Sequence, residues 1–100
     1  MTDATAAIED RSGEHRFVLE DGGATALLDY RVRGDRLVLV HTEVPDALGG
    51  RGIGGQLVRA AVARAVQDGL VVVPQCRFAR KWLEEHPDAA ANITIDWDTQ

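Results

Sequence analysis

Five glycines fall within seven positions about halfway along the chain, in the segment Gly49-Gly50-Arg51-Gly52-Ile53-Gly54-Gly55. Glycine has no Cβ, so a ligand can approach its backbone closely and φ can take either sign. The first N–H groups of the apolar helix expected after it have no intrahelical partner and lie at the positive end of the helix dipole. The segment therefore predicts a phosphate site, with the Arg51 side chain as a further donor. The alternative is a flexible connection.

Two common phosphate-binding motifs do not match this segment. A dinucleotide fold places its glycines after the first strand of a βαβ unit, whereas the strands before this segment have an antiparallel pattern. A Walker-type loop ends in Gly-Lys-Ser/Thr, whereas this one ends in Gly54-Gly55-Gln56. The segment instead resembles the acetyl-coenzyme A loop of the GNAT acetyltransferases, (Arg/Gln)-x-x-Gly-x-(Gly/Ala). Gly52 and Gly54 take the two glycine positions, and Gly49 stands where Arg or Gln is usual.

The resemblance extends on both sides of the loop. The chain carries His41-Thr42-Glu43-Val44-Pro45 before the glycines, Val71-Val72-Val73 with Pro74 after an alanine-rich helix, and then Cys76-x-Phe78 and Trp82-Leu83-x-x-His86-Pro87. Together these segments resemble the small single-domain GNAT-like N-acetyltransferases of the YjdJ type, most closely over residues 41 to 87.

This resemblance implies acetyl-coenzyme A as cosubstrate and an amine as acetyl acceptor, either a small molecule or a protein amine. A basic protein tail, a polyamine and a cellular metabolite all remain open as acceptors. Phe78 would border the pantetheine channel or belong to the core. The expected cofactor-binding residues are Gly49, Gly50, Arg51, Gly52, Ile53, Gly54, Gly55, Val44 and Phe78.

Cys76 lies two residues after Pro74, at the exit of the strand that follows the glycine-segment helix. In GNAT folds that strand diverges from its neighbour and the acyl thioester lies in the gap, so the resemblance implies that the thiol is near the acetyl group. There Cys76 could accept the acetyl group as a nucleophile or return a proton to the departing thiolate. His41 is an expected neighbour. The alternative is a small buried core residue, as most free cysteines are.

His41 and Glu43 alternate onto one face of the strand that leads to the glycine segment. Either could deprotonate an amine directly or through water, His near neutral pH and Glu if burial raises its pKa. The alternatives are a hydrogen-bonded structural histidine and a carboxylate in solvent. No metal site is predicted, because the three histidines and the cysteine lack ligand spacing.

The hydrophobic pattern predicts an α+β, compact GNAT-like fold in which an antiparallel meander precedes the glycine-segment helix, a short strand and a second helix. Alternation predicts strands over 15–20, 24–32 and 36–44, with Leu37, Leu39, His41 and Glu43 on one face of the third. Helical periodicity predicts helices over 53–66 and 77–85, and an apolar run predicts a strand over 70–73. Residues 92–97 could add an edge strand or cover an apolar patch.

Composition narrows the remaining possibilities. One hundred residues are expected to form a loose terminus over 1–13 and one domain over 14–100. The net charge of -5 argues against nucleic-acid binding, and no apolar run is long enough to cross a membrane. A single cysteine and the lack of a secretory signal are typical of a cytoplasmic protein. We expect a monomer or weak dimer.

Three functions compete. The first is an acetyl-coenzyme A dependent transferase that acts on an amine by holding the amine and the thioester together. The second is a coenzyme A or acyl-coenzyme A binding module with little or no turnover, because the chain is too short to carry the N-terminal helices that help form the acceptor site in larger GNAT enzymes. The third is an interaction domain that lost the ligand, which the intact glycine segment argues against.

Overall fold

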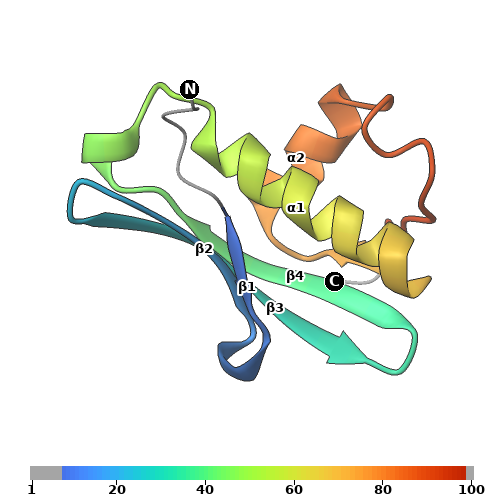
Figure 1. The fold of residues 1–100 in the computed structure, drawn as a ribbon. Helices are drawn as coiled ribbons and strands as arrows, with labels where there is room; N and C mark the ends of the chain where they lie inside the picture. Colours follow the sequence, from blue (N-terminus) through green and yellow to red (C-terminus); the bar gives the residue numbers. More distant parts are fainter. Residues whose placement is uncertain (1–7, 99–100) are drawn as a thin grey trace.

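The computed structural model describes residues 8–98, which form a five-stranded sheet and two α-helices (Figure 1). The strands lie in sequence order, and all neighbours are antiparallel except β4 and β5, which are parallel and are joined through α1. The α+β prediction is confirmed. The elements are β1 (Glu9–Arg11), η1 (Ser12–Glu14), β2 (Arg16–Asp21), β3 (Ala24–Arg33), β4 (Arg36–Glu43), η2 (Asp46–Leu48), α1 (Ile53–Asp68), β5 (Val71–Pro74) and α2 (Arg77–Glu85).

Both helices pack on the same face of the sheet (Figure 1). α1 lies across β2 and β3, and α2 lies against β4, β5 and α1. The sheet therefore has one face covered by helices and, among the described residues, one open face. The helices contribute Ile53, Leu57, Val58, Ala61, Val62, Ala65, Ala79 and Leu83 to the core between the layers.

A β-bulge in β4 interrupts the alternation of side chains. Tyr30 of β3 is opposite Leu39, whereas the preceding Asp29 is opposite His41, so Val40 is an extra residue in β4. An extra residue moves every side chain beyond it to the other face, relative to unbroken alternation.

The bulge changes the predicted face of two candidate residues. His41 and Glu43 were predicted to share a face with the buried Leu39, and this is wrong. They lie on the open face, and Thr42, opposite the buried Leu28, faces the helices instead. Period-two alternation read from the sequence carried no sign of the extra residue.

The N-terminal segment contains a strand that the sequence did not predict. Residues 1–13 were expected to be a loose terminus, and the first seven lie outside the described residues. Within the remainder, however, Glu9–Arg11 form β1, which is antiparallel to β2. The Asp10 carboxylate is bound by both Tyr30 and Arg64. A three-residue polar strand has no hydrophobic alternation, so its pairing depends on contacts from distant residues.

The other elements are close to their predicted bounds. The second helix has the predicted bounds, and α1 continues to Asp68 before ending at Gly69, whose φ is +67°. The C-terminal segment forms a single bridge to β5 at Ile95. Ile93, Ile95 and Trp97 pack against the core, so this segment mainly covers an apolar surface.

Candidate functional site

A groove of about 370 Å³ lies at the N-terminal end of α1. Small-molecule sites commonly have volumes of about 300–1,000 Å³. All the residues predicted to bind the cofactor line this groove except Arg51. The lining residues are Val44, Leu48, Gly49, Gly50, Gly52, Ile53, Gly54, Gly55, Phe78 and Trp82.

Backbone donors at the start of α1 are available to a ligand in this groove. Gly52 is the N-cap in the left-handed region, with φ +70°, and the first intrahelical bond runs from the Gln56 N–H to the Gly52 carbonyl at 3.1 Å. The N–H groups of Ile53, Gly54 and Gly55 precede that bond, and no acidic residue stands in the first turn. The helix end therefore presents donors and a positive dipole to the groove.

The Arg51 side chain lies outside the groove lining. Its Nη2 is 2.5 Å from Oδ2 of Asp21 at the end of β2, and both side chains are partly exposed. This ion pair connects the glycine segment to the β2–β3 hairpin, and it reduces the positive charge that Arg51 offers to a ligand.

Gly54 and Gly55 of α1 have a packing role. Sequence reasoning had assigned these two glycines only to ligand binding. A Cβ on Gly54 would lie 2.6 Å from Phe78 of α2, and one on Gly55 would lie 2.5 Å from Nε1 of Trp82. The Trp82 ring is stacked on His86, with centroids 4.0 Å apart. Close approach of the two helices thus requires these glycines, and α2 supplies the aromatic wall of the groove.

The parallel strands β4 and β5 part beside Cys76. Their register ends at Leu39 and Pro74, and the Leu39 carbonyl accepts hydrogen bonds from the N–H groups of Gln75 and Cys76 at 3.0 and 2.9 Å. Cys76 is the N-cap residue of α2 and is 8% exposed. The predicted position of the cysteine at the strand exit is correct.

Thr42 is the polar neighbour of this thiol, and sequence reasoning missed it. Its Oγ1 lies 3.2 Å from the Cys76 Sγ across the gap between the strands. His41 was expected there, but it faces the other side of the sheet. No local signal in the sequence marks Thr42, because the bulge that turns it toward Cys76 is visible only when β3 and β4 are paired.

His41 and Glu43 form a pair on the open face. His41 Nε2 is 3.0 Å from Glu43 Oε2, and the side chains are 54% and 64% exposed. The structure therefore brings these two candidates together and separates them from the Cys76 thiol by the thickness of the sheet.

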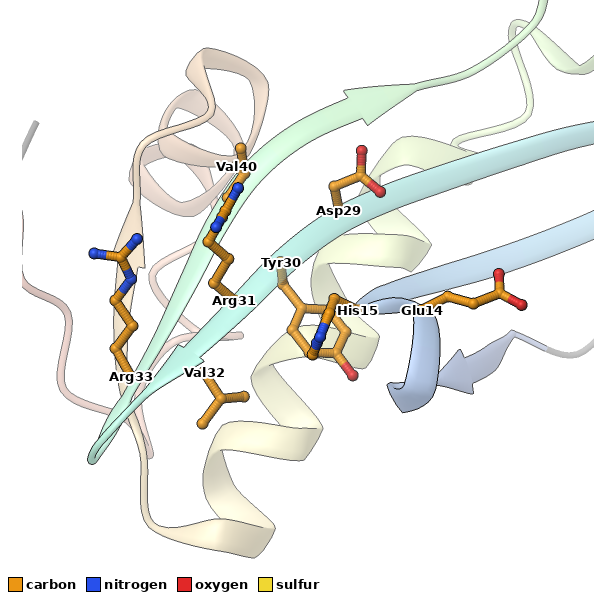
Figure 2. Close-up of a pocket in the computed structure, with 8 residues that line it drawn as sticks. All are labelled: Glu14, His15, Asp29, Tyr30, Arg31, Val32, Arg33 and Val40. Carbon is orange, nitrogen blue, oxygen red and sulfur yellow. The ribbon is translucent and has the colours of Figure 1, made fainter.

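Two adjoining hollows, of about 430 and 510 Å³, lie along the end of β3 that carries Arg31 and Arg33. The second lies on the open face, and the first extends over the edge of β3 to Tyr30 and Val32, which are on the α1 side in Figure 2. Both are lined by Arg31, Arg33 and Val40, and the second extends to Gln75 at the exit of β5. Figure 2 shows these arginines and Val40 on the side of β3 and β4 away from α1. We refer to the two hollows together as the open-face groove.

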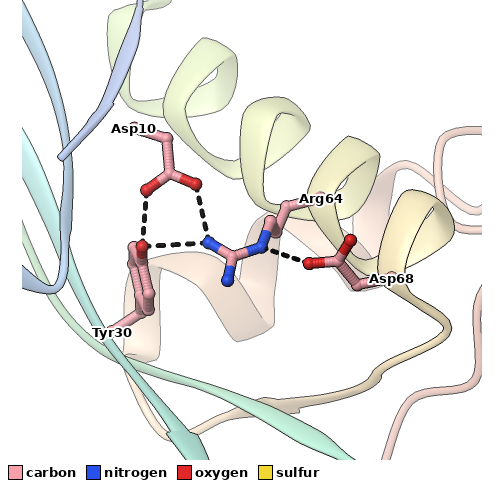
Figure 3. Close-up of polar contacts among 4 residues, drawn as sticks. All are labelled: Asp10, Tyr30, Arg64 and Asp68. Atoms are coloured by element: carbon pink, nitrogen blue, oxygen red, sulfur yellow. Dashed lines mark hydrogen bonds and ion pairs between the residues drawn. The ribbon is translucent and has the colours of Figure 1, made fainter. Parts of the chain in front are cut away.

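A polar network fixes α1 on the sheet (Figure 3). The Tyr30 hydroxyl donates to Asp10 at 2.5 Å, and Arg64 of α1 contacts both Asp10, at 2.6 Å, and Asp68, at 2.7 Å. Burial, and then the Asp10 hydrogen bond, raise the pKa of Tyr30 above its usual value. The hydrogen bond to Asp68 is the largest cause that raises the pKa of Arg64.

Comparison with known proteins agrees with this architecture. The sequence model of the GCN5-related N-acetyl-transferase family matches residues 16–93. The chain belongs to this family. The solution structure of a GCN5-like protein from Staphylococcus aureus is 30% identical and superposes with a TM-score of 0.72, covering 98% of this chain and 96% of that one. The expected GNAT-like fold is thereby confirmed.

Animal relatives match over part of their length. Protein NATD1 of Gallus gallus is 43% identical over 63 residues, which are 62% of this chain and 57% of that protein. Protein NATD1 of Danio rerio is 38% identical over 63 residues, with the same coverage. The match to this chain thus spans a little over half the length of these relatives.

The range of residues 8–98 contains no helix that is long and apolar enough to cross a bilayer. No three His, Cys, Asp or Glu side chains within it gather in an arrangement that could hold a metal ion.

Proposed function

We propose that the protein binds acetyl-coenzyme A in the groove beside the glycine segment, at the N-terminal end of α1, and transfers the acetyl group to an amine. The observation that carries this proposal is the groove at the N-terminus of α1, which is lined by the glycine segment, by Val44 directly after β4 and by Phe78 two residues after Cys76. Family membership supports it, because the match covers every element that lines the groove and the gap.

The groove suits the pyrophosphate of coenzyme A. The N–H groups of Ile53, Gly54 and Gly55 would donate to phosphate oxygens, which the helix dipole also favours. A Cβ on Gly52 would meet no atom within 4 Å, so at this position the groove is open to the ligand. Val44 and Phe78 would flank the pantetheine between the phosphates and the gap.

Cys76 and Thr42 at the gap could supply a proton to the departing coenzyme A thiolate. When bound, acetyl-coenzyme A supplies an acetyl thioester that reacts with the amine nitrogen. Cys76 would hold a proton for the departing thiolate, and Thr42, at 3.2 Å, would orient or relay that proton. If Cys76 is instead a nucleophile, the protein passes through an acetylated thiol.

In this proposal the two reactants reach the gap from opposite faces of the sheet. Coenzyme A occupies the helix-covered side, and the amine arrives from the open side at Val40, where the strands part. His41 follows Val40 on the open face and, with Glu43 at 3.0 Å, would take the proton of an incoming ammonium. Holding both reactants in this way can supply about 7–11 kcal/mol of the barrier.

Calorimetry with acetyl-coenzyme A, followed by thiol release in the presence of an amine panel, tests the proposal. We expect saturable one-site binding and amine-dependent release. Binding without release from any amine would favour a coenzyme A binding module, which the exposure of His41 and Glu43 also suits. Absence of binding would contradict the proposal.

A further inference from the structure

The open-face groove has a cationic end. Arg31 and Arg33 project from the same face of β3, because they are two residues apart in a strand. Arg33 lies directly opposite Arg36 of β4, and all three line the groove. Like charges at directly opposite positions of an antiparallel pair are destabilising. The groove therefore concentrates positive charge in a protein whose net charge is -5.

Two of these three charges have no partner among residues 8–98. Nη1 of Arg36 is 2.5 Å from Oδ2 of Asp96, and this ion pair neutralises part of the Arg36 charge. The side chains of Arg31 and Arg33 make no ion pair or hydrogen bond within this range. Two carboxylates, Glu14 and Asp29, line the first hollow, and Asp29 is already paired with Arg16 at 2.9 Å. An anion at the arginine end would meet two uncompensated guanidinium groups.

The open-face groove also reaches the place where β4 and β5 part. Val40 and Gln75 line the groove there, and Gln75 precedes Cys76. Arg31 lies opposite Val38, two residues before Val40, which is about 7 Å along the strand. Figure 2 shows the Arg31 side chain extending toward Val40. One small molecule could thus contact both the arginine end and the gap.

We propose that the acetyl acceptor is a small amine that carries an anionic group, a carboxylate or a phosphate, bound by Arg31 and Arg33. This inference rests on the proposed function and adds the acceptor class. In the reaction the amine nitrogen forms the amide bond, the thioester C–S bond breaks, the amine loses one proton and the coenzyme A thiolate gains one. Basic protein tails and polyamines are repelled by the groove.

A panel of acceptors of matched length tests the charge preference. The probes are 4-aminobutanoate, its neutral amide, 1,4-diaminobutane and 3-aminopropylphosphonate, each followed by thiol release. We expect kcat/KM to be at least tenfold higher for the carboxylate or the phosphonate than for the amide, and lowest for the diamine. The better of the two anions identifies the source of the charge. Equal rates for all four, or a preference for the diamine, would overturn the inference.

Variants of the two arginines test whether the preference for anionic acceptors arises in the open-face groove. Arg31→Gln with Arg33→Gln should raise KM for the anionic acceptors at least tenfold, and should leave both the neutral amide and acetyl-coenzyme A affinity unchanged. The control variant carries Arg77→Gln and Lys81→Gln and loses the same amount of positive charge from the exposed side of α2. It should change neither KM for any acceptor nor the affinity for acetyl-coenzyme A. Equal effects of the two double variants would show a general charge effect and contradict the assignment.

Binding gives a readout that does not need turnover. In protein saturated with coenzyme A, which has no acetyl group to transfer, 4-aminobutanoate should shift the backbone amide resonances of residues 31–33, and its neutral amide should not. Failure of acetyl-coenzyme A to bind would remove the proposed function itself. Acetyl-coenzyme A binding without anion-dependent shifts at residues 31–33 would remove only the acceptor class.

Discussion

Thr42 Oγ1 and Cys76 Sγ lie 3.2 Å apart across the gap where the parallel strands β4 and β5 part. The contact exists because the extra residue Val40 moves Thr42 onto the helix-covered face. It couples a hydroxyl to the only thiol of the chain. If the gap holds the thioester, this pair can supply and relay a proton there.

Cys76→Ala should lower kcat by at least about tenfold, because general acid catalysis typically contributes 10²–10⁴-fold. The dissociation constant for acetyl-coenzyme A should stay within a few-fold, since the loss falls on the transition state. Steady-state kinetics and calorimetry on the same preparation measure both, and Thr42→Val should show a smaller loss of the same kind. Mass spectrometry of wild-type protein after incubation with acetyl-coenzyme A would reveal an acetyl adduct at Cys76 if the thiol is a nucleophile. Full activity in a folded Cys76→Ala protein would place Cys76 in the core alone.

His41→Ala should remove the acid limb of the kcat/KM profile, whereas Glu43→Gln should keep it. A histidine base works only when its imidazole is neutral, so the rate should rise with pH and then level off. The profile is measured with an acceptor whose amine titrates well above the tested range. Loss of the limb in Glu43→Gln alone would assign the proton to the carboxylate. Its persistence in both variants would mean that the amine arrives deprotonated and that the protein contributes positioning.

Gly55→Ala should destabilise the fold, although alanine is the better helix former by about 1 kcal/mol. The added Cβ would lie 2.5 Å from Nε1 of Trp82, and overpacking of this kind typically costs about 1–3 kcal/mol. The sign should reverse in a Trp82→Ala background, where the obstacle is absent and helix propensity alone remains. Urea unfolding of the four proteins in this cycle measures the coupling. Equal effects of Gly55→Ala in both backgrounds would refute the packing role of Gly55.

Tyr30 is the only tyrosine in the chain, so its ionisation can be followed by tyrosinate absorbance. Burial, assisted by the Asp10 hydrogen bond, raises its pKa in the folded protein, and its midpoint should exceed the usual value of about 10. Because the folded pKa is raised, the stabilisation from this group is complete below the unfolded pKa and is lost as pH rises through the folded pKa. Tyr30→Phe should be less stable at neutral pH, and it should lack this component of the alkaline loss. A midpoint at or below the usual value would contradict the arrangement in Figure 3.

Local patterns in the sequence were sufficient to predict the two helices and the glycine segment that precedes α1. The bounds of α2 follow from its amphipathic residues and from Pro74 and Pro87 on either side. Glycine spacing before a long apolar stripe identified the N-terminus of α1. These features depend on residues close together in the chain, where propensity and periodicity operate directly.

Contacts between distant residues escaped sequence reasoning. The bulge at Val40 is visible only when β3 and β4 are paired, and it reversed the faces of His41 and Thr42. The role of Gly55 against Trp82 depends on how closely α1 and α2 approach, which no local pattern specifies. Strand β1 depends on the Asp10 contact with Arg64, 54 positions away.

We propose that the N-terminus of α1 binds the phosphates of acetyl-coenzyme A, and one matched pair of glycine variants tests this binding. Gly52 and Gly69 stand at opposite ends of this helix with φ of +70° and +67°, and a Cβ at either would meet no atom within 4 Å. Gly52→Ala and Gly69→Ala should therefore lose similar folding free energy, but only Gly52 lines the groove. Calorimetry should show acetyl-coenzyme A bound at least tenfold more weakly by Gly52→Ala, about 1.4 kcal/mol, and with wild-type affinity by Gly69→Ala. Equal affinities of the two folded variants would show that acetyl-coenzyme A does not bind at the N-terminus of α1.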